Sequence, residues 1–322
     1  MTMTLAEIRL KQNPILTNLL LGMGQGTYIG EKLFPRLPQA LSSVTLAQLG
    51  DERLRRYNLR RAPGGPTKRV NIKYEGKVYS VKQYAVDVPM PRELLREADE
   101  GRRLNVGSYL DVSRIAMATA NDILGLDYEL EVAQLATSPD TYAPGHVLAL
   151  AGSTKWSAET GTPVTDIRAA ADVIRKKIGK RPNQLDLGAD AFTALSTNKE
   201  VKSYLPTTNL GPANIEQLKT ILNVSEINVG DAVWIDETDT GRDVWGNNAV
   251  LAYVPKIGAG GSSDISLAEP AFGFTNVIEG HPFAETPYFT TDGTKSWIYG
   301  ATYERQPNVA YNAAAFLFTN AK

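Results

Sequence analysis

The feature that most constrains the fold is a long helical pattern over residues 104–135. Apolar side chains recur there at three- and four-residue steps in two neighbouring stripes, the pattern of a helix that is covered on two sides. Such a helix would be about 45 Å long, more than the diameter of a small domain. We therefore expect it to be a spine along which the rest of the chain is arranged. One stripe holds Val106, Tyr109, Leu110, Met117, Ala120, Ile123, Leu124 and Leu135, and the other holds Val112, Ile115, Ala116, Leu126, Leu130 and Ala133.

Composition bounds the class of protein. The chain has 322 residues, of which 43% are hydrophobic and 21% charged, as in a folded globular protein. Cysteine is absent, which excludes disulfides, thiolate nucleophiles and cysteine metal sites. The 34 Lys and Arg nearly balance the 35 Asp and Glu, so the chain lacks the overall positive field of a dedicated nucleic-acid binder. No apolar run approaches the roughly 18 residues of a membrane span, and no signal-peptide pattern opens the chain, so we expect no contact with a membrane.

Motifs for chemistry are missing from the sequence. It contains no G-x-S-x-G elbow, H-E-x-x-H pair or GKS/GKT loop, and its two histidines, His146 and His281, stand apart. The acidic run 236–243 lacks the spacing of a calcium loop, and we interpret it as the tip of a hairpin between two strands. The expectation is a non-enzymatic protein with no catalytic residue, no cofactor and no metal.

Residues 1–56 form the first segment. They combine apolar side chains with closely spaced glycines and prolines, so they cannot close a core of their own. We interpret them as an extended arm that lies on the body or on a neighbouring subunit; a disordered tail is the alternative. Ile29 and Phe34 are therefore candidate contacts between subunits.

Residues 57–92 form the second segment. Alternating side chains over 67–88 predict a long β-hairpin that turns at Glu75-Gly76. Lysine and tyrosine occur on both faces, so we expect the hairpin to project and find its partner elsewhere. Its candidate contact residues are Lys73, Tyr74, Lys77, Tyr79 and Lys82.

A basic run precedes that hairpin and overlaps it. Eight Lys or Arg lie between Arg53 and Lys73, and such a run contacts either phosphate or acidic protein surfaces. The net charge of −1 favours the protein contact. The candidate residues are Arg55, Arg56, Arg60 and Arg61.

The remaining chain divides into three further segments, 93–159, 160–255 and 256–322. In the first, Trp156 is expected to anchor a Pro/Gly/Ser-rich connection. The second mixes helices and strands without a regular strand–helix rhythm, which indicates the α+β class. It opens with a helix over 164–179, for which Thr165 is a plausible N-cap and Gly179 the stop. The third segment is mostly strand.

Several segments resemble, in order, the major capsid proteins of tailed bacteriophages, which have the Hong Kong 97 phage capsid fold. LTNLLLGMGQGTYIGEKLFPRLP resembles the N-terminal arm of that family, and KVYSVKQYAVDVPMPRELLREAD resembles its extended loop. DYELEVAQLATSPDTY resembles the end of the spine helix, and IRKKIGKRPNQLDLGADAFTALSTNKEVKSYL resembles a stretch of the axial domain. VWGNNAVLAYVP and EPAFGFT resemble the return to the peripheral domain. The order of the segments, more than any single motif, carries the resemblance.

The resemblance implies an α+β capsid fold with an arm (1–56), an extended hairpin loop (57–92), the spine helix and first part of a peripheral domain (93–159), an axial domain (160–255) and peripheral return strands (256–322). It implies a shell protein of the virion that assembles in the host cytoplasm. Its partners would be further copies of itself as hexamers and pentamers, a portal, a decoration protein and non-specifically contacted double-stranded DNA. Because no charged coiled coil precedes the arm, we expect a separate scaffolding protein. The alternatives are an encapsulin-like nanocompartment shell and, less favoured, an enzyme with an unrecognised site.

Overall fold

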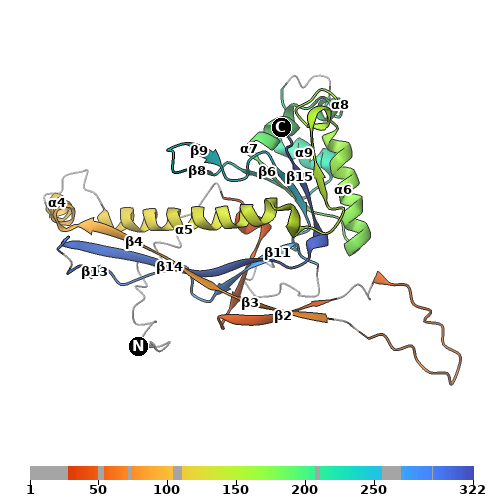
Figure 1. Ribbon diagram of the computed structural model, residues 1–322, viewed down its shortest axis with the longest axis horizontal. Helices are drawn as coiled ribbons and strands as arrows, with labels where there is room; N and C mark the ends of the chain where they lie inside the picture. Colours follow the sequence, from red (N-terminus) through yellow and green to blue (C-terminus); the bar gives the residue numbers. More distant parts are fainter. Residues whose placement is uncertain are drawn as a thin grey trace.

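The computed structural model describes residues 28–49, 54–71, 74–103, 111–206, 211–255, 270–291 and 293–322. Figure 1 shows a long horizontal helix lying over an extended sheet, with a second mixed unit of helices and strands above one end of that helix. The α+β class predicted from the sequence is therefore the class of the structure.

The spine is helix α5 (Val112–Thr137), and the predicted residues 104–110 lie outside the described part of the chain. Asp111 caps it by accepting a hydrogen bond from the Arg114 amide at 3.1 Å. The first half packs on a sheet through Met117, Ala120 and Leu124. The second half joins the main core with the arm and the second unit. The prediction that other elements cover the spine helix on two sides is only partly correct, because Ile115 and Ile123 are 43% and 47% exposed in the single subunit.

The sheet beneath the spine has six strands, in the order β1-β11-β14-β12, with β4 and β13 also pairing with β14. Its centre is the long strand β14, which is antiparallel to β4 over ten residue pairs. The only parallel pair among the described strands of this sheet joins β1 to β11, so the arm supplies an edge strand. The strands are β1 (Arg36–Gln39), β4 (Lys82–Pro91), β11 (Gly273–Ile278), β12 (Phe283–Ala284), β13 (Tyr288–Phe289) and β14 (Ser296–Val309).

The second unit contains a five-stranded sheet in the order β5-β15-β10-β6-β7. The C-terminal strand β15 (Ala315–Thr319) lies in this sheet between β5 (Val147–Ala149) and β10 (Ala249–Ala252). Residues 256–322 are predicted as peripheral return strands, whereas the ladder of β15 joins it to β10 in the unit that contains 160–255. The other strands are β6 (Gln184–Gly188) and β7 (Glu226–Gly230), and the surrounding helices are α6 (Pro163–Ile178), α7 (Ala189–Thr197), α8 (Lys199–Ser203) and α9 (Ile215–Leu222).

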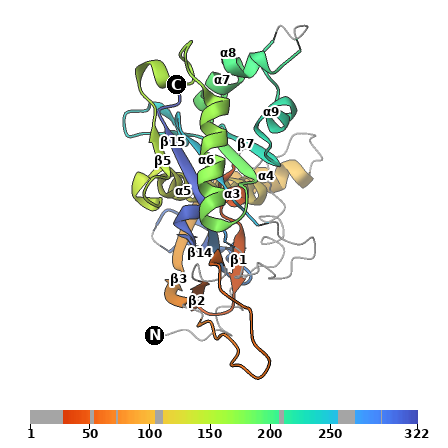
Figure 2. The same cartoon turned by 90° about the vertical axis from the view of Figure 1, so that its right-hand side faces the viewer.

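Helix α6 forms the outer side of this unit (Figure 2). It ends as predicted at Gly179, whose φ of 76° is left-handed, a conformation that glycine adopts at low cost. The expected N-cap at Thr165 is wrong: the helix begins at Pro163 because proline fits the first helical position. Instead, the backbone amide and the hydroxyl of Thr165 both donate to the Glu200 carboxylate.

Trp156 anchors its connection, as predicted. Its side chain is fully buried, its ring lies 5.2 Å from that of Phe318, and its indole N–H donates to Asp166 at 3.1 Å. The anchor fastens the segment after the spine to the C-terminal strand.

The predicted projecting hairpin is wrong in register. Glu75 and Gly76 lie inside strand β3 (Tyr74–Ser80), which pairs antiparallel with β2 (Ser43–Leu49) from the arm. Strand β4 does not project, because its half-buried side chains pack against the spine. Of the residues described, those that project are the irregular stretch 54–71 (Figure 1). A Glu-Gly pair is a weak turn signal, and pairing with a strand contributed by the arm outweighs it.

Candidate intersubunit surface

The projecting stretch 54–71, named here the basic loop, carries six Lys or Arg and no acidic residue. Its path runs out beyond the ends of β2 and β3 (Figure 1), and most of its side chains are exposed. Three of these are apolar: Leu54, Leu59 and Val70 are 49%, 74% and 40% exposed. A surface that joins positive charge to exposed apolar side chains is suited to another protein.

The other sequence-derived candidates fall into different places. Ile29 and Phe34 are 3% and 0% exposed, and both lie in the core of their own chain. Tyr79 is buried against Phe274, with ring centres 5.8 Å apart. Lys82 is exposed at the start of β4, whereas Arg55, Arg56, Arg60 and Arg61 are exposed on the basic loop. Tyr74 and Lys77 occupy β3 opposite Leu49 and Leu46 of β2, and Lys73 lies outside the described residues.

A buried carboxylate on the spine fixes the arm, and no sequence pattern pointed to it. Glu129 is 0% exposed and accepts hydrogen bonds from the backbone amides of Ile29 and Gly30, both at 2.8 Å. Its third donor is the Trp245 indole, at 2.7 Å, from the second unit. A Cβ at position 30 would lie 2.6 Å from the carboxylate, so glycine is needed there. One side chain thus joins the arm, the spine and the second unit, although burial raises the pKa of Glu129.

A second buried carboxylate lies nearby in strand β6. Asp186 is 1% exposed and accepts hydrogen bonds from the Gln184 amide at 2.9 Å and the Asn228 amide at 2.8 Å. Lys32 from the arm donates to Asn228 at 3.1 Å, which ties this group to the arm as well. Burial raises the pKa of Asp186 to about 7.

That pKa gives a pH prediction for stability. A carboxyl group whose pKa is higher in the folded state binds protons more tightly there, so this contribution falls as pH rises from about 4 to about 7. The shift corresponds to a loss on the order of 4 kcal/mol of unfolding free energy across that window. We expect Asp186→Asn to flatten the dependence, measured by urea unfolding of the subunit between pH 4 and 8. Asp231→Asn, at an exposed site of the same unit, should leave the slope as in the parent, and equal slopes in all three proteins would contradict the assignment.

Arg305 is the second residue that sequence reasoning missed. It is 0% exposed in β14, and its guanidinium lies over the rings of Tyr84 and Tyr128, 4.2 and 4.8 Å from their centres. It donates to Asp127 at 2.6 Å and Glu131 at 2.5 Å on the spine. Arg305 therefore joins the spine to the sheet, and an arginine inside a strand was its only sequence signal.

The acidic run 236–243 lies where the sequence predicted it, at the tip of a hairpin. Strand β8 (Val233–Ile235) is antiparallel to β9 (Gly241–Asp243). Asp236 closes the turn by accepting from the Thr238 and Thr240 amides at 2.8 and 3.1 Å. Among the described residues, no cluster of three His, Cys, Asp or Glu side chains is placed to hold a metal ion. In the same part of the chain, no helix has the length and apolarity needed to cross a membrane.

Comparison with known proteins shows which proteins this chain resembles in sequence and in structure. No protein-family model matches the chain. The sequence is 31% identical over 275 residues to the major capsid protein of Burkholderia phage BcepMu, an alignment that spans 85% of this chain and 86% of that protein. A phage-related protein from Bordetella bronchiseptica RB50, known from a crystal structure, has a TM-score of 0.75 at 35% identity, covering 96% of this chain and 97% of its own.

More distant structures agree in fold. The capsid of Cyanophage P-SCSP1u gives a TM-score of 0.56 at 12% identity, with 90% of this chain and 87% of that chain covered. The SrpI encapsulin of Synechococcus elongatus PCC 7942 gives 0.54 at 12% identity, with 99% and 95% covered. At such low identity the likeness concerns the fold alone, and it confirms the Hong Kong 97 phage capsid fold without separating a virus shell from a nanocompartment.

Sequence similarity distinguishes a virus shell from a nanocompartment, because this chain aligns with a phage major capsid protein over most of both lengths. The protein is a structural component of the virion shell and not an enzyme. The chain belongs to the family of major capsid proteins of tailed bacteriophages, which self-assemble into the icosahedral head.

Proposed function

We propose that the chain assembles as hexamers and pentamers into a closed head around double-stranded DNA, and that the basic loop reaches over a neighbouring subunit. The observation that carries the proposal is this loop, whose charged and apolar side chains are exposed beyond the body of their own subunit. In a monomer such an extension adds no stabilising contact, whereas in a symmetric shell the same contact between neighbours repeats at every subunit.

The proposed partner of Arg55, Arg56, Arg60 and Arg61 is an acidic surface of the neighbouring subunit. The near-neutral chain supports a protein partner, since a DNA-binding surface is usually accompanied by an overall positive charge. Lys73, Tyr74, Lys77 and Lys82 are proposed to border the same contact. For Ile29, Phe34 and Tyr79, which are buried, we propose an indirect part: they hold the arm and β3 in place.

Further partners are proposed from family membership. They are a separate scaffolding protein during assembly in the host cytoplasm, a portal, a decoration protein and packaged DNA held by non-specific contact. Uniform closed shells from this chain expressed alone would argue against the need for scaffolding. Mass analysis of natural particles tests the contents, since genomic DNA is expected and a loaded enzyme would indicate a nanocompartment.

The loop contact is tested by replacing Arg55, Arg56, Arg60 and Arg61 together with glutamine. All four side chains are exposed, so the subunit should stay folded by circular dichroism. We expect the variant to fail in shell assembly, measured by sedimentation velocity and negative-stain electron microscopy with scaffolding protein present. The matched control replaces the same four residues with lysine, which keeps the charge and should still assemble. Normal shells from the glutamine variant would refute the loop contact.

A further inference from the structure

The hairpin β8–β9 carries an apolar face that the described part of its own subunit leaves exposed. Val233 and Ile235 are 51% and 70% exposed, and because they are two residues apart on a strand they share one face. The intervening Trp234 is half-buried. Hydrogen bonds from Thr238, Thr240 and Arg242 to Asp236 fix the turn, so the face is presented on a defined element.

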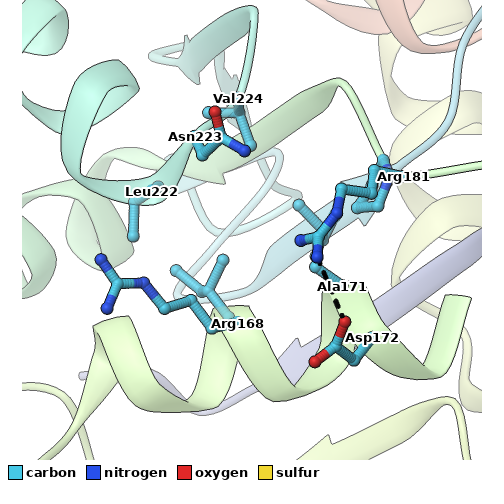
Figure 3. Close-up of a pocket in the computed structure, with 10 residues that line it drawn as sticks. Arg168, Ala171, Asp172, Arg181, Leu222, Asn223 and Val224 are labelled. Atoms are coloured by element: carbon cyan, nitrogen blue, oxygen red, sulfur yellow. Dashed lines mark ion pairs between the residues drawn. The ribbon is translucent and has the colours of Figure 1, made fainter. Parts of the chain in front are cut away.

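A pocket with complementary features lies on the opposite side of the same unit, between α6 and α9 (Figure 3). It has a volume of about 270 Å³. Arg168 and Arg181 line the pocket. The Arg168 guanidinium donates to the Ile221 carbonyl oxygen at 3.0 Å and to Tyr204 Oη at 3.3 Å. The Arg181 guanidinium lies 3.6 Å from the Asp172 carboxylate. The other lining residues include the apolar Ile167, Ala171, Leu222, Val224 and Leu251.

The two surfaces also carry opposite charge. Residues 231–243 contain five carboxylates and one arginine, whereas residues 164–181 contain six Lys or Arg and two Asp. Glu237 and Asp239 at the hairpin tip are exposed, as is Arg181 at the pocket. Complementary charge guides association and fixes the register of two docked surfaces.

The surfaces cannot meet within one chain. Figure 1 shows β8 and β9 extending from the second unit on the side away from α6, and Figure 2 shows α6 on the face opposite to that extension. A surface on one side of a subunit that fits a different surface on the other side makes a head-to-tail contact, and repetition of that contact gives a ring when the rotation between copies closes.

We propose that the β8–β9 hairpin of one copy docks in the α6–α9 pocket of the next copy, and that this contact joins the subunits of each ring. Ile235 enters the apolar part of the pocket, and Glu237 faces Arg181. The inference rests on the proposed assembly of this chain into hexamers and pentamers, and it names the surfaces that make them.

Paired cysteines test the contact directly, because the natural chain contains none. Ile235→Cys and Ala171→Cys are introduced together, and shells are first verified by electron microscopy and then oxidised. A disulfide forms only where Cα atoms approach to about 4.4–6.8 Å, so a ladder of linked oligomers on a non-reducing gel is the expected result. Each single variant serves as the control and should stay monomeric on the gel. Verified shells without any ladder would overturn the docking alone, whereas failure of the unsubstituted chain to form shells with scaffolding protein would overturn the proposed assembly and, with it, the docking.

An exchange of charges between Glu237 and Arg181 tests the proposed contact independently. Glu237→Arg and Arg181→Glu should each cause loss of rings and shells, because each places like charges together. The double variant should regain part of the assembly, since the pair is restored with its signs exchanged while Asp172, 3.6 Å from the Arg181 guanidinium, faces a second carboxylate. Both sites are exposed, so folding should be unchanged by circular dichroism. Normal assembly of both single variants would overturn the proposed pairing.

Discussion

Glu129→Ala is expected to lower the free energy of unfolding of the subunit by about 3 to 5 kcal/mol. The substitution removes the acceptor of three buried donors, namely the amides of Ile29 and Gly30 and the Trp245 indole. Each buried donor left without an acceptor costs about 1 to 3 kcal/mol. Because the donors come from the arm and the second unit, the loss should release the arm from the spine. Urea unfolding of the unassembled subunit measures the first effect, and hydrogen exchange of residues 29–34 measures the second.

Two variants control this experiment. Asp122→Ala removes an exposed carboxylate from the same helix and should change stability by no more than about 0.5 kcal/mol. Glu129→Gln keeps an acceptor oxygen and should lie between the alanine variant and the parent. If Glu129→Ala unfolds at the same urea concentration as Asp122→Ala, the carboxylate is not the anchor of the arm.

Arg305→Ala should have an effect of similar size, about 3 to 5 kcal/mol. Its side chain is fully buried against Tyr84, Tyr128 and Tyr303, so truncation removes three cation–π contacts and leaves a cavity. The Asp127 and Glu131 carboxylates also lose their partner. Thermal or urea unfolding measures the loss.

The controls separate the contributions of the Arg305 site. Arg305→Lys keeps the charge but not the planar fork that stacks and donates twice, so an intermediate loss is expected. Asp127→Asn should cost less than about 1 kcal/mol, because the Asp127 side chain is 53% exposed and water screens the pair. A loss from Asp127→Asn as large as that from Arg305→Ala would show that the ion pair, rather than burial among the rings, holds the spine to the sheet.

The sequence by itself determined the features that depend on neighbouring residues. The three- and four-residue apolar steps located the spine helix, and Gly179 marked the end of α6 because a left-handed residue there favours glycine. The bulk of Trp156 marked a buried anchor. The order of the segments along the chain was also sufficient to identify the family, because homology is a property of sequence.

Only the tertiary structure decided what joins distant parts of the chain. Strand β3 pairs with β2 from the arm, and no local pattern distinguishes that ladder from the hairpin expected at Glu75-Gly76. Glu129 lies 100 residues from Ile29 and 116 from Trp245, and Arg305 lies 174 residues from Glu131. A glutamate in a helix and an arginine in a strand are expected to be exposed charges, since burial depends on partners that folding brings in from elsewhere. The physical reason is that periodicity encodes which face of an element is covered, whereas the identity of the covering element is set by packing between segments far apart in sequence.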